Sequence, residues 1–168
     1  WDPSMQWTND GGAWTSNGDT MENFCLPTAS GGTGPSSAAS NDNYIFVESS
    51  FPNYPVKGPF VMSIELFLTN NVELSFSYHM FGISHNEISG VSSLFKLKIN
   101  NISVFELSGD QGDNWINYSI IIDKGFKKIS WEFTTGNSYQ CDFAIDEIEF
   151  VLVPDVIEPE PEPEPELV

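Results

Sequence analysis

The chain has 168 residues, of which 40% are hydrophobic and 14% aromatic, so it is long enough to fold around one hydrophobic core. It has 24 acidic residues, six lysines and no arginine, which gives a net charge of −18. This charge argues against binding to nucleic acids and to anionic membranes, because few cations are present to neutralise phosphates. No hydrophobic run approaches the roughly 20 residues that cross a bilayer, and no signal peptide is recognisable, so we expect a mature or excised portion of a secreted protein.

The first 43 residues are rich in glycine, serine, asparagine and threonine. They contain Trp1, Trp7 and Trp14, which we expect to anchor loops or short strands onto a core. Residues 44–50 form a predicted strand, and the three prolines of residues 51–59 predict a loop.

Residues 72–81 carry the clearest strand signal. Apolar and polar side chains alternate from Val72 to Met80, a period of two that is typical of a half-buried antiparallel strand. Asn100-Asn101 predicts a tight hairpin turn. The other predicted strands span residues 60–68, 94–99, 102–107, 115–122, 126–133 and 141–153.

This succession of about nine to eleven strands, with no convincing helix, predicts an all-β domain over residues 1–153. Aromatic and β-branched residues favour strands, because they fit a pleated surface. A jelly-roll β-sandwich of two antiparallel sheets is the economical way to bury so many strands.

The composition changes at Pro154. Proline alternates with glutamate up to Glu166, which no central strand or helix tolerates. The repetition predicts a stiff, extended and acidic spacer or connector over residues 154–168, with a rise of about 3.1 Å per residue. Simple disorder is the alternative. The apolar pair Leu167-Val168 follows the glutamates and is a candidate contact for another copy of the chain.

Cys25 and Cys141 are the two cysteines of the chain. A disulfide between them would close a loop of more than 100 residues. In an oxidising compartment it would stabilise the fold by about 4–5 kcal/mol in the chain-entropy model. Two free buried thiols are the alternative.

Five groups of segments occur in an order that resembles the MAM domain, a family of extracellular adhesion modules. They are Trp7-Thr8-Asn9-Asp10 with Trp14-Thr15, Thr33-Gly34-Pro35 with residues 44–50, Leu74 to Gly82 (LSFSYHMFG), Gly109-Asp110-Gln111-Gly112 with Trp115, and Trp131-Glu132-Phe133 with Ala144 to Ile148 (AIDEI). The resemblance covers about residues 7–150. It implies a jelly-roll sandwich that acts outside the cell in adhesion or self-association, without catalysis.

The chain departs from this family at its cysteines and at its first strand. MAM domains often carry four cysteines in two bridges, but Glu73 stands where a cysteine usually precedes the LSF sequence. Neither Cys25 nor Cys141 falls at an expected position. The family's opening strand is not recognisable, which predicts an open sheet edge to which another chain can add a strand.

Catalytic motifs are not recognisable in the sequence. His79 lies on the polar face of its predicted strand and His85 in the following loop, without the nucleophile elbow of a Ser-His-Asp enzyme or the second close ligand pair of a zinc site. Asp146 and Glu147 are expected to point to opposite faces of the last strand, so they would not form one acid–base pair. We expect a protein that is not an enzyme, and a stand-alone hydrolase is the least favoured alternative.

Asp146 is also the centre of a predicted structural calcium site. A hard cation needs oxygen ligands from several segments, and Asp10, Asp19 and Glu22 would supply carboxylates from the N-terminal region. Some MAM-like domains hold a cation in this region, so the resemblance supports Ca²⁺. The alternative is a carboxylate that accepts backbone N–H groups.

Two tripeptides match the N-glycosylation sequon, which is used only in a eukaryotic secretory pathway. Asn101-Ile102-Ser103 lies at the predicted hairpin turn and Asn117-Tyr118-Ser119 on a predicted strand.

Four aromatic residues are candidates for a platform on which sugar rings stack. Such a platform needs exposed rings, and packing in the core or at its rim is the alternative. The four candidates are Trp1, Phe51, Tyr54 and Trp115.

We therefore expect a secreted or cell-surface adhesion or assembly module. A sharper hypothesis makes the chain the repeating subunit of an extracellular filament, in which it associates with other copies through Leu167 and Val168 or through an open sheet edge. A carbohydrate-binding module is the alternative function. The expected partners are other protein chains and glycans, with neither nucleic acid nor membrane insertion.

Overall fold

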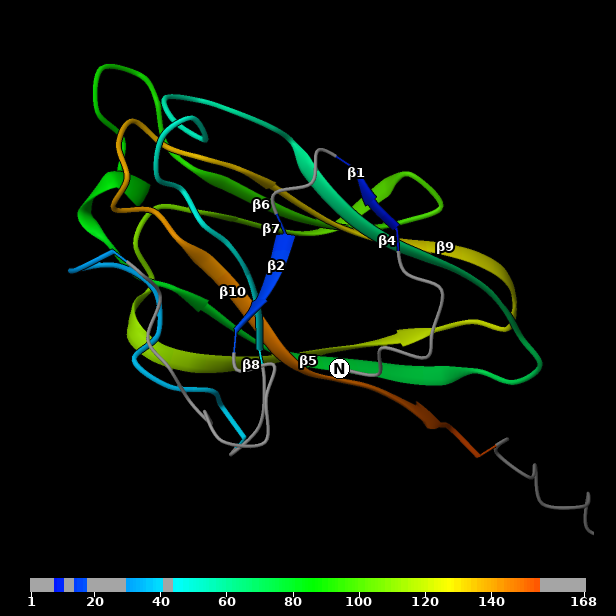
Figure 1. Cartoon of the computed structure of the whole chain (residues 1–168). Helices are drawn as coiled ribbons and strands as arrows, with labels where there is room; N and C mark the ends of the chain where they lie inside the picture. The colour runs from blue at the N-terminus through cyan, green and yellow to red at the C-terminus, as the bar shows by residue number, and fades with distance from the viewer. Residues whose placement is uncertain (1–7, 11–13, 18–29, 41–43, 155–168) are drawn as a thin grey trace, which may run out of the picture.

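The chain folds into two five-stranded antiparallel sheets that pack face to face (Figure 1). The computed structural model describes residues 8–10, 14–17, 30–40 and 44–154. The first sheet has the strand order β1-β4-β9-β6-β7 and the second the order β2-β3-β10-β5-β8. The strands are β1 (Thr8–Asp10), β2 (Trp14–Asn17), β3 (Tyr44–Val47), β4 (Phe60–Leu68), β5 (Val72–Met80), β6 (Leu94–Ile99), β7 (Ile102–Ser108), β8 (Gly112–Ile122), β9 (Gly125–Thr134) and β10 (Phe143–Leu152).

These elements confirm the predicted all-β sandwich. The bounds of β4 and β6 are those that the sequence predicts, and β8 begins earlier, at Gly112. A short 3₁₀ turn, η1 (Ile83–His85), interrupts the loop after β5. Within the described residues no helix is long and apolar enough to cross a membrane.

The core lies between the sheets and follows the alternation of the strands. Val72, Leu74, Phe76 and Met80 of β5 are buried on its inner face, as the sequence predicts. Aromatic rings from both sheets meet at the centre: Phe143 of β10 stacks on Phe95 and Phe133 of the first sheet, with ring centroids 4.4 and 4.9 Å apart. This burial supplies the main driving force for folding.

The β6–β7 hairpin turns where the sequence predicts it. Asn100 and Asn101 both have positive φ angles, 51° and 66°, as the two central residues of a type I′ turn do. Asparagine tolerates this region better than most residues, since its side chain can bond locally. The Asn100 side chain accepts a hydrogen bond from the backbone N–H of Lys128, at 2.8 Å.

The opening of the chain forms two short strands, which is one of the two forms expected there, because β1 pairs with β4 and β2 pairs with β3. In the part of the chain that the structure describes, β1 pairs only with residues 61–63 of β4, so an open sheet edge that takes a strand from another chain stays a prediction. Within the described residues, the longer edge strands are β7 and β8, on the other side of the sandwich.

Candidate functional site

Residues 30–40 cover one part of the outer face of the second sheet. Ala38 packs there in a small apolar cluster with Tyr44, Phe46 and Ala144. The indole N–H of Trp115 donates to the carbonyl of Ser37, at 2.9 Å. His79, on the polar face of β5, is buried and packs against Trp115, with ring centroids 5.4 Å apart.

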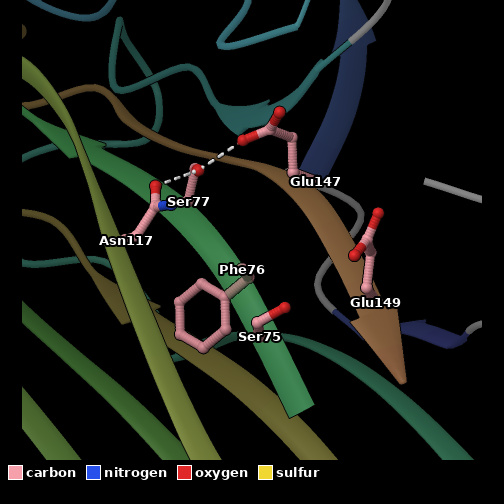
Figure 2. A pocket seen from close by; sticks show the side chains of 6 residues that line it. All are labelled: Ser75, Phe76, Ser77, Asn117, Glu147 and Glu149. Atoms are coloured by element: carbon pink, nitrogen blue, oxygen red, sulfur yellow. Dashed lines mark hydrogen bonds between the residues drawn. The ribbon is translucent and has the colours of Figure 1, made fainter. Parts of the chain in front are cut away.

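Beside this covered part, the outer face of the second sheet carries a polar groove (Figure 2). The groove has a volume of about 210 Å³. Its lining comes from three neighbouring strands: β5, β8 and β10. The residues are Ser75, Phe76, Ser77, Asn117, Glu147 and Glu149. The ring of Phe76 lies in the core, so the groove itself presents hydroxyl, carboxamide and carboxylate groups.

Ser77 joins the two walls of the polar groove. Its Oγ lies 2.7 Å from Asn117 Oδ1 and 2.7 Å from Glu147 Oε2. A serine hydroxyl has one proton, so it donates to one of these oxygens at a time. Rotating the Asn117 carboxamide by half a turn satisfies both contacts, because its NH₂ then donates to Ser77 and Ser77 donates to Glu147. The trio therefore holds Glu147 across the groove.

A β-bulge in β10 places Glu147 at this position. The register of β10 against β5 shifts between Asp146 and Glu149, and Glu147 has a positive φ of 53°. A bulge inserts one residue and re-aims the neighbouring side chains. Asp146 and Glu147 consequently both bond to groups on the outer face, so the expectation that they point to opposite faces is wrong. Strict alternation holds only in a strand without a bulge.

Asp146 is buried and is held by backbone donors. Its carboxylate accepts hydrogen bonds from the N–H groups of Ala39, Ser40 and Glu147, at 2.9, 3.3 and 2.7 Å. Burial raises the pKa of Asp146, and these three bonds oppose the rise. The carboxylate thus ties the covering segment to β10.

The calcium site stays a prediction. Asp10 lies in β1 of the first sheet, whereas Asp146 lies in the second, and Asp19 and Glu22 fall outside the described residues. In the described part of the chain, no group of three acidic, histidine or cysteine side chains converges for a metal ion. The oxygens of Asp146 already accept backbone hydrogen bonds, which is the alternative that the sequence leaves open.

His85 is fully buried beside β6. Its Nε2 donates to the backbone carbonyl of Asp142 at 3.1 Å, so its Nδ1 accepts the hydroxyl proton of Ser93 at 2.6 Å. Ser93 and His85 have no exposed surface, so no substrate reaches this pair. His79 places Nε2 3.0 Å from Asp113, and burial lowers its pKa. Both histidines therefore connect segments of the fold.

His85 makes stability depend on pH. Burial lowers its pKa from 6.5 to about 4, so the folded state binds fewer protons than the unfolded state between these values. The stabilisation is complete above pH 6.5 and is lost as the pH falls toward 4, by about 3 kcal/mol. We expect urea midpoints of His85→Gln to fall less than those of the wild type between pH 7 and pH 5. Parallel curves for the two proteins would contradict this.

Several other predicted residues lie apart from the polar groove. Cys141 is a buried thiol whose pKa is raised by burial, and Cys25 lies outside the described residues, so their disulfide stays a prediction. Asn101 is exposed at its turn, and Asn117 is exposed at the groove. Neither sequon is tested by this geometry.

The four aromatic candidates do not form one platform in the described residues. Phe51 and Tyr54 contact each other in the loop of residues 51–59, whereas Trp115 packs on Tyr44 and His79. Trp1, Leu167 and Val168 lie outside the described residues. The sequence does not predict the polar groove itself. Its only local signal is the polar face of β5, and the register of β8 and the bulge of β10 complete it.

A protein-family model described as "MAM domain, meprin/A5/mu" matches residues 3–154. Among solved structures, TmCBM61 in complex with β-1,4-galactotriose is similar at a TM-score of 0.51 and 14% identity, with 88% of each chain covered. The K3 cleaved adhesin domain of Lys-gingipain from Porphyromonas gingivalis W83 has a TM-score of 0.51 and 13% identity, covering 84% of this chain and 91% of that one. At these identities the two structures show a shared fold alone.

Proposed function

The chain belongs to the MAM domain family, whose members are extracellular, non-catalytic adhesion modules, and from this premise we propose that it binds its partner through the polar groove. The proposal makes the protein a non-enzymatic adhesion or assembly module outside the cell.

The polar groove is the observation that carries the proposal. Residues 30–40 cover one part of the outer face, so the groove is the part of this face where β5, β8 and β10 offer their polar side chains to a partner. The Ser77–Asn117–Glu147 contacts fix its shape before binding. A pre-organised site loses less conformational entropy when a ligand binds.

In a more specific version of this proposal, the partner is a second copy of the chain. In the most specific version, the copies join into a filament. The acidic Pro-Glu segment supplies a connector between copies in that version. Its support comes from the sequence and from the family's role in adhesion.

A carbohydrate-binding module is the second candidate, and the chemistry of the polar groove favours it. Sugar hydroxyl groups both donate and accept hydrogen bonds, and Ser75, Asn117 and Glu149 offer complementary groups in one place. The fold shared with TmCBM61, which holds a galactotriose, is consistent with this function. Because no aromatic ring faces the groove among its described lining residues, recognition would rest on hydrogen bonds and not on stacking.

The test compares two charge-matched pairs of substitutions. Glu147→Gln with Glu149→Gln alters the polar groove, and Glu65→Gln with Glu87→Gln changes the same charge at exposed positions elsewhere. We expect either that beads coated with the wild type adhere to one another or that the wild type binds a glycan array. Binding in that assay should fall at least tenfold for Glu147→Gln with Glu149→Gln and stay unchanged for Glu65→Gln with Glu87→Gln. The groove proposal fails if the wild type is inactive in both assays or if both pairs lose binding equally.

A further inference from the structure

Three of the six lysines of this chain, Lys96, Lys98 and Lys128, lie on the outer face of the first sheet. The chain has six lysines and no arginine against 24 acidic residues. Lys96 and Lys98 of β6 alternate with the buried Phe95 and Leu97, so both point outward. Lys128 of β9 points outward as well, next to Glu65 of β4. Each of these lysines contacts one glutamate, so in the described residues this face brings three positive charges to meet three of the negative charges.

A groove of about 270 Å³ lies at this place, and we call it the lysine groove. Its lining combines two lysines with an apolar corner. The residues are Pro59, Leu94, Lys96, Lys98, Glu132 and Thr134. The side chains of Lys96 and Lys98 are 31% and 27% exposed, and each contacts one glutamate, Glu106 at 3.0 Å and Glu132 at 2.8 Å. A lysine ammonium has three donors, so each can bond a further carboxylate.

The spacing of these lysines matches the glutamates of the Pro-Glu segment. Alternate residues of a strand are about 6.6 Å apart. In an extended polyproline conformation, alternate residues are about 6.2 Å apart along the axis. Glu160, Glu162 and Glu164 repeat with this period. With three residues per turn, glutamates two residues apart point about 120° apart around this axis, so two of them can reach the two lysines from opposite sides of the segment.

The direction of β10 favours a neighbouring copy over the same chain. The backbone N–H of Val153 bonds to the carbonyl of Asn71, so the chain leaves the sandwich at the end where β4 and β5 are joined. Figure 1 shows β10 running outward at this end. Pro59, Leu94 and Thr134 lie toward the opposite end, since β4 begins, β6 begins and β9 ends there. To reach the groove of its own chain, the segment would have to reverse direction, which a proline-rich sequence disfavours.

We propose that residues 155–168 of one copy bind in the lysine groove of a second copy. The contact is head-to-tail, because the two copies contribute different surfaces, and such contacts build rings or open filaments. The inference deepens the assembly form of the proposed function. It rests on the proposed function for assembly alone, because the lysine groove lies on the first sheet and the polar groove on the second.

Sedimentation velocity of the full chain in about 0.1 M salt tests the proposal. We expect the wild type to associate with increasing concentration and to dissociate in about 1 M salt, where charge contacts are screened. Lys96→Gln with Lys98→Gln should weaken the association at least tenfold. The matched pair Lys124→Gln with Lys127→Gln makes the same charge change outside the groove and should retain it within about threefold.

A second variant separates a specific contact from general repulsion. Glu160→Gln, Glu162→Gln and Glu164→Gln together lower the net negative charge, so they would strengthen association if only repulsion between copies mattered. The proposal requires them to weaken it, and they leave the folded domain unchanged. A wild type that is monomeric at every concentration, or equal losses in both lysine pairs, overturns the proposal. Sedimentation of the lysine and Pro-Glu variants reads the lysine groove, whereas glycan-array binding by Glu147→Gln with Glu149→Gln reads the polar groove, so failure of one proposal is distinguishable from failure of the other.

Discussion

Replacing Phe76 by alanine should reduce the free energy of unfolding by about 3–5 kcal/mol. Phe76 of β5 is 1% exposed and lies where the two sheets meet. Its ring contacts Phe95 and Trp131 of the first sheet and Tyr118 of its own, with centroids 6.2, 6.1 and 5.6 Å apart. Truncation loses the transfer free energy of the ring and leaves a cavity that rigid aromatic neighbours cannot fill.

Urea unfolding measures this loss as a lower midpoint at an unchanged slope. Phe51→Ala is the matched control, because Phe51 is 81% exposed and should change stability by no more than about 0.5 kcal/mol. Phe76→Leu should fall between the two, because leucine keeps much of the buried volume. A loss below about 1 kcal/mol for Phe76→Ala would show that the sheets do not depend on this contact.

Gly82→Ala should destabilise the fold by about 2–5 kcal/mol, through two separate causes. Gly82 follows β5 and has φ 140° and ψ 145°, a region that residues with a Cβ rarely adopt. A Cβ there would overlap the carbonyl oxygen of Gln140 and come within 2.8 Å of Thr33 Oγ1. The overlap with Gln140 is with its backbone, so it cannot be relieved by turning a side chain.

Gly31→Ala is the control for this prediction. A Cβ at Gly31 would have no atom beyond its chain neighbours within 4 Å, and Gly31 has no positive φ. Alanine there should change stability by no more than about 0.5 kcal/mol. Thermal unfolding of the two variants compares them directly. Equal melting temperatures would mean that the loop around Gly82 relaxes without cost.

The sequence predicts most of the fold because the relevant signals are local. Alternation from Val72 to Met80 identifies the inner face of β5, and Asn100-Asn101 identifies a turn, from neighbouring residues alone. The family resemblance, carried by short motifs in order, is confirmed by the match to the family model over residues 3–154.

The sequence fails where an outcome depends on contacts between distant segments. A bulge in β10 is specified by its pairing with β5, so the faces of Asp146 and Glu147 could not be derived from alternation. β1 and β2 are three and four residues long, too short for a periodic signal, and pairing with β4 and β3 makes them strands. Alternation places His79 on a polar face, but it is 2% exposed and packs against Trp115 of β8.

The amino-acid sequence by itself therefore determined the fold class, the main strands, the family resemblance and the acidic character of the protein, because periodicity, turn residues and charge are properties of adjacent positions. Only the tertiary structure decided which polar side chains share a surface. Ser77, Asn117 and Glu147 are up to 70 residues apart in sequence and meet only because β5 lies between β8 and β10. Strand order and register, which place these residues together, result from burying one continuous core between the two sheets.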